Sequence, residues 1–159
     1  SAICAGAPGT HKPGNLRAAM LGIHNSTRRA YGSAPLVWNA KLAADAAVWA
    51  RKLASGAASG HDPQTGAAPV QGENLASATR GSCRPVALAQ FWVDEKKFFQ
   101  KGTFPNVSTT GNWASVGHYT QIIWPGTRQI GCALRKGARF DFLVCRYLPS
   151  GNAEGTVLK

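Results

Sequence analysis

The chain has 159 residues, of which 44% are hydrophobic and 16% are charged. This length can bury the core of one domain, and the ordinary apolar content argues against a disordered chain. No apolar run reaches the length of a membrane span. We therefore expect a single folded domain over residues 1–159, with residues 1–12 as an irregular N-terminal tail.

The charge is strongly basic, because 18 Lys and Arg face 7 Asp and Glu, which gives a formal net charge of +11. Such a charge attracts anionic partners, for example an acidic polysaccharide or an anionic membrane surface. The basic residues are scattered, without a basic block or a nucleic-acid motif, so we expect no specific nucleic-acid partner. The alternative is that the charge serves only solubility and surface adhesion.

The first hundred residues favour helices. Residues 15–31 predict a helix that Gly32 ends, and His24 in its middle is interpreted as a buried structural residue. An extended apolar connector (33–38) leads to Asn39, a helix N-cap, and to a second helix over about 40–55. A third helix is predicted over about 85–99, with Pro85 in its first turn.

Between the second and third helices lies a long segment, residues 56–84, with little periodicity. Loops of this length in a compact domain are usually functional. It places His61 and Glu73 each directly after a glycine, and residues 74–78 are interpreted as a short helical turn. Both ionisable side chains are therefore candidates for a functional site.

Glu95 lies on the apolar face of the third helix, four positions before Phe99 and three after Trp92. A carboxylate placed there must be paired or hydrogen-bonded, or its pKa rises. The alternative is a shift of the helix boundary that leaves Glu95 in solvent.

His118 lies in the segment 117–124 (GHYTQIIW), where bulky apolar neighbours place it at the edge of a core. It is a candidate metal ligand or acid/base; the alternative is a structural histidine. The preceding loop, residues 101–116, holds Phe104 and Trp113. Two strands follow, 129–135 and 140–147, and the second is predicted to be central because both of its faces are largely apolar. The tail after Pro149 is predicted to be loose.

The four cysteines are widely spaced, which disfavours a cysteine-rich zinc site and favours two disulfides. Three pairings are possible. Cys132 and Cys145 lie on neighbouring predicted strands, so we expect them to pair and to leave Cys4 for Cys83. Two disulfides indicate an oxidising compartment, either extracellular or periplasmic.

Two histidines and two glutamates therefore stand out: His61, Glu73, Glu95 and His118. Zinc binds imidazole and carboxylate groups, and a glutamate would serve either as a third ligand or as a partner that orients the rings. Such a site could activate water, with a glutamate as general base. The spacing contains no His-Glu-x-x-His motif and does not itself show that the four residues meet.

Six segments carry a further signal: two long ones, residues 117–124 and 142–152, and four shorter ones, residues 23–25, 36–43, 72–75 and 92–95. In their residues and in their order along the chain, they resemble the CAP superfamily of cysteine-rich secretory proteins, insect antigen 5 and plant pathogenesis-related class one proteins. Together they cover roughly residues 15–152. One departure is Val116, where the plant members have a cysteine.

The resemblance implies an α-β-α sandwich, with a small antiparallel sheet between helical layers, in which residues 117–124 form a short helix leading into a strand. It implies that His61, Glu73, Glu95 and His118 form a cleft tetrad, with the two histidines binding zinc or another divalent cation. It also implies a small hydrophobic ligand, a sterol or fatty acid, at the loop that holds Phe104 and Trp113.

We therefore expect a secreted binding protein for small hydrophobic ligands with a divalent-metal site. One alternative is a metal-dependent, peptidase-like hydrolase that uses Glu73 or Glu95 as its base. Another is an adhesion module for anionic surfaces.

Overall fold

The computed structural model describes Cys4 and residues 15–159; the predicted tail, residues 1–12, lies outside the described residues except for Cys4. The helices are α1 (Leu16–Tyr31), α2 (Ala40–Ser55), α3 (Pro85–Asp94) and α4 (Gly117–Ile123), with short 3-10 turns at Glu95–Phe98 and Trp113–Ser115. The strands are β1 (Val37–Trp38), β2 (Gly72–Thr79), β3 (Gly102–Thr103), β4 (Gln129–Lys136), β5 (Phe140–Leu148) and β6 (Val157–Leu158). No helix among these residues is long and apolar enough to cross a membrane.

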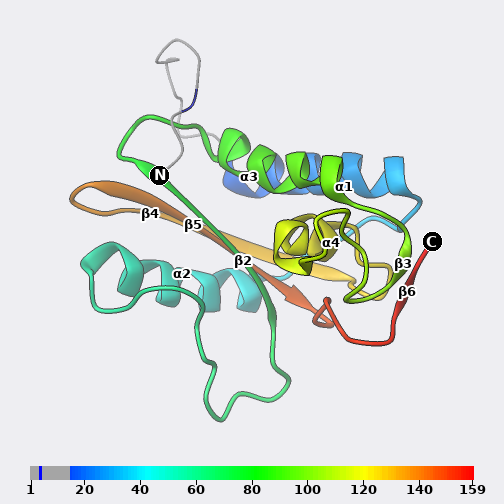
Figure 1. Ribbon diagram of the computed structural model, residues 1–159. Coiled ribbons are helices and arrows are strands. Elements are labelled where there is room, and N and C mark those ends of the chain that lie inside the picture. The colour runs from blue at the N-terminus through cyan, green and yellow to red at the C-terminus, as the bar shows by residue number, and fades with distance from the viewer. Residues whose placement is uncertain (1–3, 5–14) are drawn as a thin grey trace.

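The main sheet has four strands in the order β1-β4-β5-β2. β1 pairs parallel with β4, and the other neighbours are antiparallel. α2 packs on one face of this sheet, while α1, α3 and α4 cover the other (Figure 1). The predicted α-β-α sandwich is confirmed, and so is the central position of β5.

Local signals explain the helix ends. The side chain of Asn39 accepts hydrogen bonds from the amides of Lys41 and Leu42 at the start of α2, as an N-cap does. α1 and α2 end at Gly32 and Gly56, whose φ values of 108° and 79° suit glycine.

β2 corrects one prediction. Residues 74–78 do not form a helical turn but belong to a strand that pairs with β5 over eight positions. Alanine and serine give little strand signal by themselves. The strand forms here because of its pairing with a segment about 70 residues away, which local sequence does not reveal.

Two further boundaries differ from prediction. α3 ends at Asp94 and tightens into the 3-10 turn, so the predicted helix over 85–99 is too long. The tail after Pro149 is not loose throughout, since β6 pairs with β3 and buries Leu158 completely. Leu158 packs there with Phe104, Val116 and Trp124 in a small satellite core.

Arg28 connects α1 to the end of α4. Its fully buried guanidinium donates to the carbonyls of Ile122 and Trp124 at 2.9 and 2.8 Å, and to Ala34 and Thr127 at 2.6 and 3.0 Å. The last carbonyls of a helix have no partner within the helix, so these bonds cap α4 and fix the turn that leads to β4. Burial lowers the pKa of Arg28 to about 10, which leaves it cationic at neutral pH.

Both predicted disulfides are confirmed. Cys132 and Cys145 lie directly opposite each other on β4 and β5, with Cα atoms 4.1 Å apart. This spacing is typical of an antiparallel pair that does not exchange backbone hydrogen bonds. Cys4 bonds to Cys83, in the turn before α3.

Candidate functional site

His61 and Glu73 form the first of two histidine–glutamate pairs. His61 lies in the connection after α2, and Glu73 is the second residue of β2; Nδ1 of His61 is 2.6 Å from Oε1 of Glu73. The connection is held in place because Trp49 on α2 donates to the carbonyl of Gly60 at 3.0 Å. The imidazole remains 63% exposed, whereas the carboxylate is almost fully buried.

Arg146 on β5 holds Glu73 from the other side. Its Nε donates to Oε2 of Glu73 at 2.6 Å, and its two terminal nitrogens bind Asp62 at 2.8 Å and Gln71 at 3.0 Å. The Asp62 amide donates to Oε1 of Glu73 at 3.1 Å, so three groups donate to this carboxylate. Hydrogen bonding to Glu73 raises the pKa of the His61 imidazole, although burial and Arg146 oppose the rise.

His118 and Glu95 form the second pair. Oε2 of Glu95 is 2.7 Å from Nδ1 of His118, and Oε1 accepts the amides of His118 and Tyr119 at 2.9 and 3.1 Å. Glu95 therefore receives three hydrogen bonds from the start of α4 and is not left in solvent. The indole of Trp92 stacks on the His118 imidazole, with ring centroids 6.0 Å apart.

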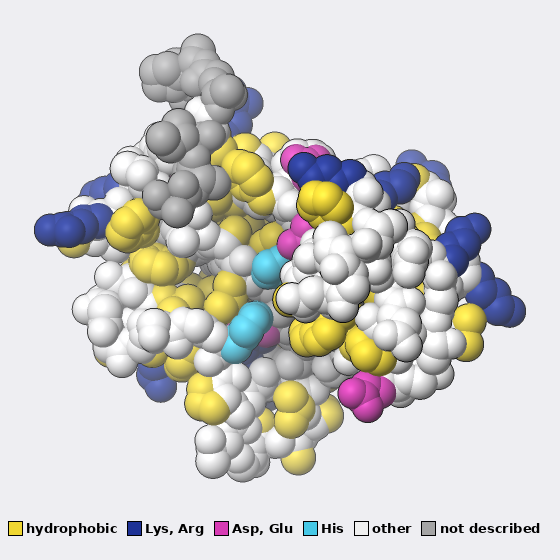
Figure 2. Space-filling model, in the orientation of Figure 1, with side chains coloured by type: hydrophobic (Ala, Val, Ile, Leu, Met, Phe, Trp, Pro, Cys, Tyr) yellow, Lys and Arg dark blue, Asp and Glu magenta, His cyan; other side chains and the backbone are white. Residues whose placement is uncertain are grey.

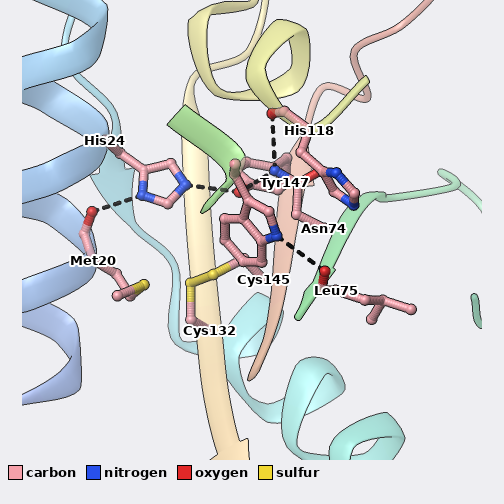
Figure 3. The surroundings of a disulfide bond; sticks show 9 residues. Met20, His24, Asn74, Leu75, His118, Cys132, Cys145 and Tyr147 are labelled. Atoms are coloured by element: carbon pink, nitrogen blue, oxygen red, sulfur yellow. Dashed lines mark hydrogen bonds between the residues drawn. A yellow bond between two sulfur atoms is a disulfide. The ribbon is translucent and has the colours of Figure 1, made fainter. Parts of the chain in front are cut away.

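A buried chain of hydrogen bonds runs from the backbone of His118 on α4 through β2 and β5 to α1 (Figure 3). Asn74, next to Glu73, donates to the carbonyl of His118 at 3.1 Å and to the hydroxyl of Tyr147 at 3.2 Å. That hydroxyl donates to Nε2 of His24 at 2.7 Å, and Nδ1 of His24 donates to the carbonyl of Met20 at 2.7 Å. His24 is thus the buried structural histidine that its helical position predicted.

The two pairs share one chemical arrangement. A carboxylate only accepts hydrogen bonds, so in the neutral imidazoles of His61 and His118 the proton is on Nδ1 and Nε2 keeps its lone pair. Figure 2 shows two histidine side chains exposed near each other on one face. They are His61 and His118, since His24 is fully buried and His11 is not described.

Such rings can bind a metal ion or move a proton through Nε2. Within the described residues no group of three or more His, Cys, Asp or Glu is arranged to hold a metal ion. The protein therefore offers two imidazoles, and water or a ligand would complete the coordination of a cation.

The loop proposed for a hydrophobic ligand has one buried and one exposed aromatic residue. Phe104 is 3% exposed and packs edge-on against Trp113 and Trp124, with centroids 5.4 and 5.6 Å away. Trp113 is 45% exposed and also contacts the region of Gly117, where an added Cβ would lie 2.7 Å from its ring. Trp113 is therefore the aromatic residue of this loop that a ligand can reach.

Sequence reasoning missed three residues that build the site: Arg146, Asn74 and Tyr147. Arg146 carried a signal, because a charged residue in a strand with two apolar faces needs a buried partner. Asn74 carried none, because its role depends on the backbone of α4.

Known proteins resemble this chain over most of its length. The model of the cysteine-rich secretory protein family (CAP) matches residues 21–147. Venom allergen 5 of Polybia scutellaris rioplatensis is 37% identical over 127 residues, which are 76% of this chain and 58% of that protein. The basic form of pathogenesis-related protein 1 of Nicotiana tabacum is 34% identical over 138 residues, 85% of this chain and 71% of that protein.

Among solved structures, NaASP2 with Zn²⁺ is similar with a TM-score of 0.74 at 19% identity, over 90% of this chain and 84% of that one. Na-ASP-1 is similar with a TM-score of 0.72 at 22% identity, over 99% of this chain and 46% of that one. At these identities the likeness concerns the fold. The chain spans less than two thirds of the length of venom allergen 5. The family match over residues 21–147 and the similarity to pathogenesis-related protein 1 show that this chain belongs to the cysteine-rich secretory protein (CAP) family.

Proposed function

We propose that this protein is a secreted binding protein whose cleft holds a divalent cation, such as zinc, between Nε2 of His61 and Nε2 of His118. The observation that carries the proposal is that each ring is fixed through Nδ1 by its own carboxylate. Metal-binding histidines are commonly oriented in this way, with the second nitrogen bonded to a carboxylate. NaASP2, which shares the fold, has been crystallised with Zn²⁺. Two disulfides and membership of a secretory family support export.

In this proposal the glutamates orient the rings and do not bind the ion. We expect Glu73→Gln and Glu95→Gln each to weaken zinc binding about 10- to 100-fold without abolishing it, since a neutral amide holds the ring less firmly. Calorimetric titration with zinc measures this. Asp94→Asn is the matched control, because Asp94 is exposed and its side chain bonds to Gln90 alone among the residues that the structure describes. Zinc affinities of both glutamine variants equal to that of Asp94→Asn would contradict the orienting role.

Peptidase-like hydrolysis in the same cleft is the less favoured function. A general base must be free to accept a proton from water. Glu73 and Glu95 each already accept three hydrogen bonds, and one of the three donors to Glu73 is the Arg146 cation. The geometry therefore favours binding over catalysis.

A small hydrophobic ligand, a sterol or fatty acid, is the second function that we propose, with Trp113 as its contact. The observation that favours it is a large aromatic ring that stays 45% exposed although its loop is anchored by Phe104. Exposed aromatic rings of this kind often contribute to ligand contacts.

Trp113→Ala is expected to weaken the binding of labelled cholesterol or palmitate about tenfold, because one aromatic contact is lost. Equilibrium partition of the labelled lipid measures this. Phe91→Ala is the control, since Phe91 is 43% exposed but lies on α3. Equal losses in both variants, or no lipid binding by the wild type, would contradict the assignment.

A further inference from the structure

β2 is an edge strand with few of the features that usually protect an edge. Among Cys4 and residues 15–159 it pairs only with β5, and the register is continuous over eight positions. Natural edge strands are commonly blunted by charges, prolines or bulges. The residues from Leu75 to Thr79 contain neither a charge nor a proline. This edge is therefore suited to accept another strand.

The hydrogen-bond pattern shows which backbone groups lie on the open side. The Arg80 amide donates to the carbonyl of Arg139 at 2.8 Å, so the even-numbered residues of β2 bond to β5 and the odd-numbered ones face away. The carbonyl of Leu75 confirms this, because it accepts from Nε1 of Trp92 at 3.0 Å. Beyond Trp92, the N–H and C=O of Ser77 and the N–H of Thr79 have no hydrogen-bond partner among the described residues.

A hollow of about 200 Å³ runs along the same stretch and is mainly apolar. It is lined by Leu53, Gly60, Leu75, Ala76, Ser77 and Phe142. Figure 2 shows hydrophobic side chains lining a hollow on the face that carries the two exposed histidines. Side chains alternate along a strand, so every second side chain of an added strand would face this hollow.

The end of β2 is basic. Three exposed residues form what we call the basic cluster: Arg80, whose amide bonds to Arg139, together with Arg139 itself and Lys136, both beside the β4–β5 turn. Nη1 of Arg80 also donates to the carbonyl of Gly137 at 3.3 Å, which ties β2 to the β4–β5 hairpin. The nearby carboxylate of Asp141 is 4% exposed and accepts the Gly81 amide at 2.9 Å, so it offers a partner little negative charge.

We propose that the edge of β2 at Ser77 and Thr79 binds an extended, acidic peptide segment of a partner protein by strand addition. Backbone hydrogen bonds would supply affinity, the hollow would accept an apolar side chain, and carboxylates would lie against the basic cluster. This interaction goes beyond cation and lipid binding and requires neither.

The test begins with a display library of random short peptides, from which binders are selected on the immobilised wild-type protein at low salt. The affinities of the enriched peptides are then measured by fluorescence anisotropy. We expect acidic peptides that bind Ser77→Pro at least about tenfold more weakly than wild type, because proline removes the outward N–H. Ser77→Ala is the matched control and keeps wild-type affinity. Arg139→Glu weakens binding several-fold more than Arg29→Glu, which makes the same charge change on α1.

Peptides methylated at alternate backbone nitrogens test strand geometry on the unchanged wild-type protein. Methylation of the peptide amides that would bond to β2 is expected to abolish binding. Methylation of the alternate amides, which would point away from β2, is expected to leave binding unchanged. The proposal is overturned if both sets behave alike, if no acidic peptide is enriched, or if Ser77→Pro binds as wild type does. If dextran sulfate displaced the acidic peptides and these peptides bound Ser77→Pro as tightly as wild type, the basic cluster would be a general polyanion surface. That result would also overturn the proposal.

Discussion

Arg28→Met is expected to lower the free energy of unfolding by about 3–5 kcal/mol. The guanidinium is fully buried and donates to four backbone carbonyls, two of them in the last turn of α4 and its cap. Each hydrogen bond from a charged donor contributes about 1.5–3 kcal/mol net, and a buried carbonyl without a donor is costly. Removing the cost of burying the cation offsets part of this sum.

Urea unfolding followed by tryptophan fluorescence measures the effect. Arg29→Met is the control, because the neighbouring Arg29 is exposed in the same turn and its replacement should change stability by no more than about 0.5 kcal/mol. If the two variants differed by less than about 1 kcal/mol, Arg28 would not be the link between α1 and α4.

The second large effect is a loss of stability in mild acid. Burial lowers the pKa of His24 from 6.5 to about 4, although its bond to Met20 opposes the shift. Between these two pKa values the unfolded chain binds a proton that the folded protein does not, so stability falls as the pH falls. The change amounts to about 3 kcal/mol between pH 6.5 and 4, at 1.36 kcal/mol per pKa unit.

The other titratable groups with shifted pKa values change the stability outside the range from pH 6.5 to 4. Because the pKa of His61 is raised in the folded state, protonation of His61 stabilises the fold. This stabilisation is fully present below pH 6.5 and is lost as the pH rises above that value. The lowered pKa values of Asp45 and Asp62 affect stability below about pH 4.

Denaturant unfolding between pH 7 and 4, with a chelator present, isolates the effect of His24. His24→Gln can keep both hydrogen bonds but does not titrate, so its stability should fall by about 3 kcal/mol less over this range. Parallel pH profiles for the two proteins would contradict the assignment of acid sensitivity to His24.

The helices were predictable because their signals are local. Asn39 caps α2, glycines end α1 and α2, and apolar residues recur at helical spacing. The 3-10 turn after α3 was not predictable from periodicity. It arises where Glu95 bonds to the start of α4, a contact between residues more than 20 positions apart.

The residue types of the candidate site were predictable, but their pairing was not. Sequence motifs and the family resemblance indicated two histidines and two glutamates. That Glu73 holds His61 while Glu95 holds His118 depends on how β2 and α4 lie against each other. Arg146 and Asn74 became part of the site through contacts between residues far apart in the sequence, from Arg146 to Glu73 on the neighbouring strand and from Asn74 to the backbone of His118 on α4.

Calorimetric titration with zinc tests the central claim most directly, on wild type and on the His61→Ala/His118→Ala double variant, at neutral pH and near pH 5. We expect one zinc ion per wild-type chain at neutral pH and no binding by the double variant. Near pH 5 binding should weaken at least about tenfold, because protonated imidazole does not bind metal and the pKa of His61 is raised. A folded wild-type protein that binds no zinc, or a double variant that binds it equally well, would contradict a cation site between His61 and His118.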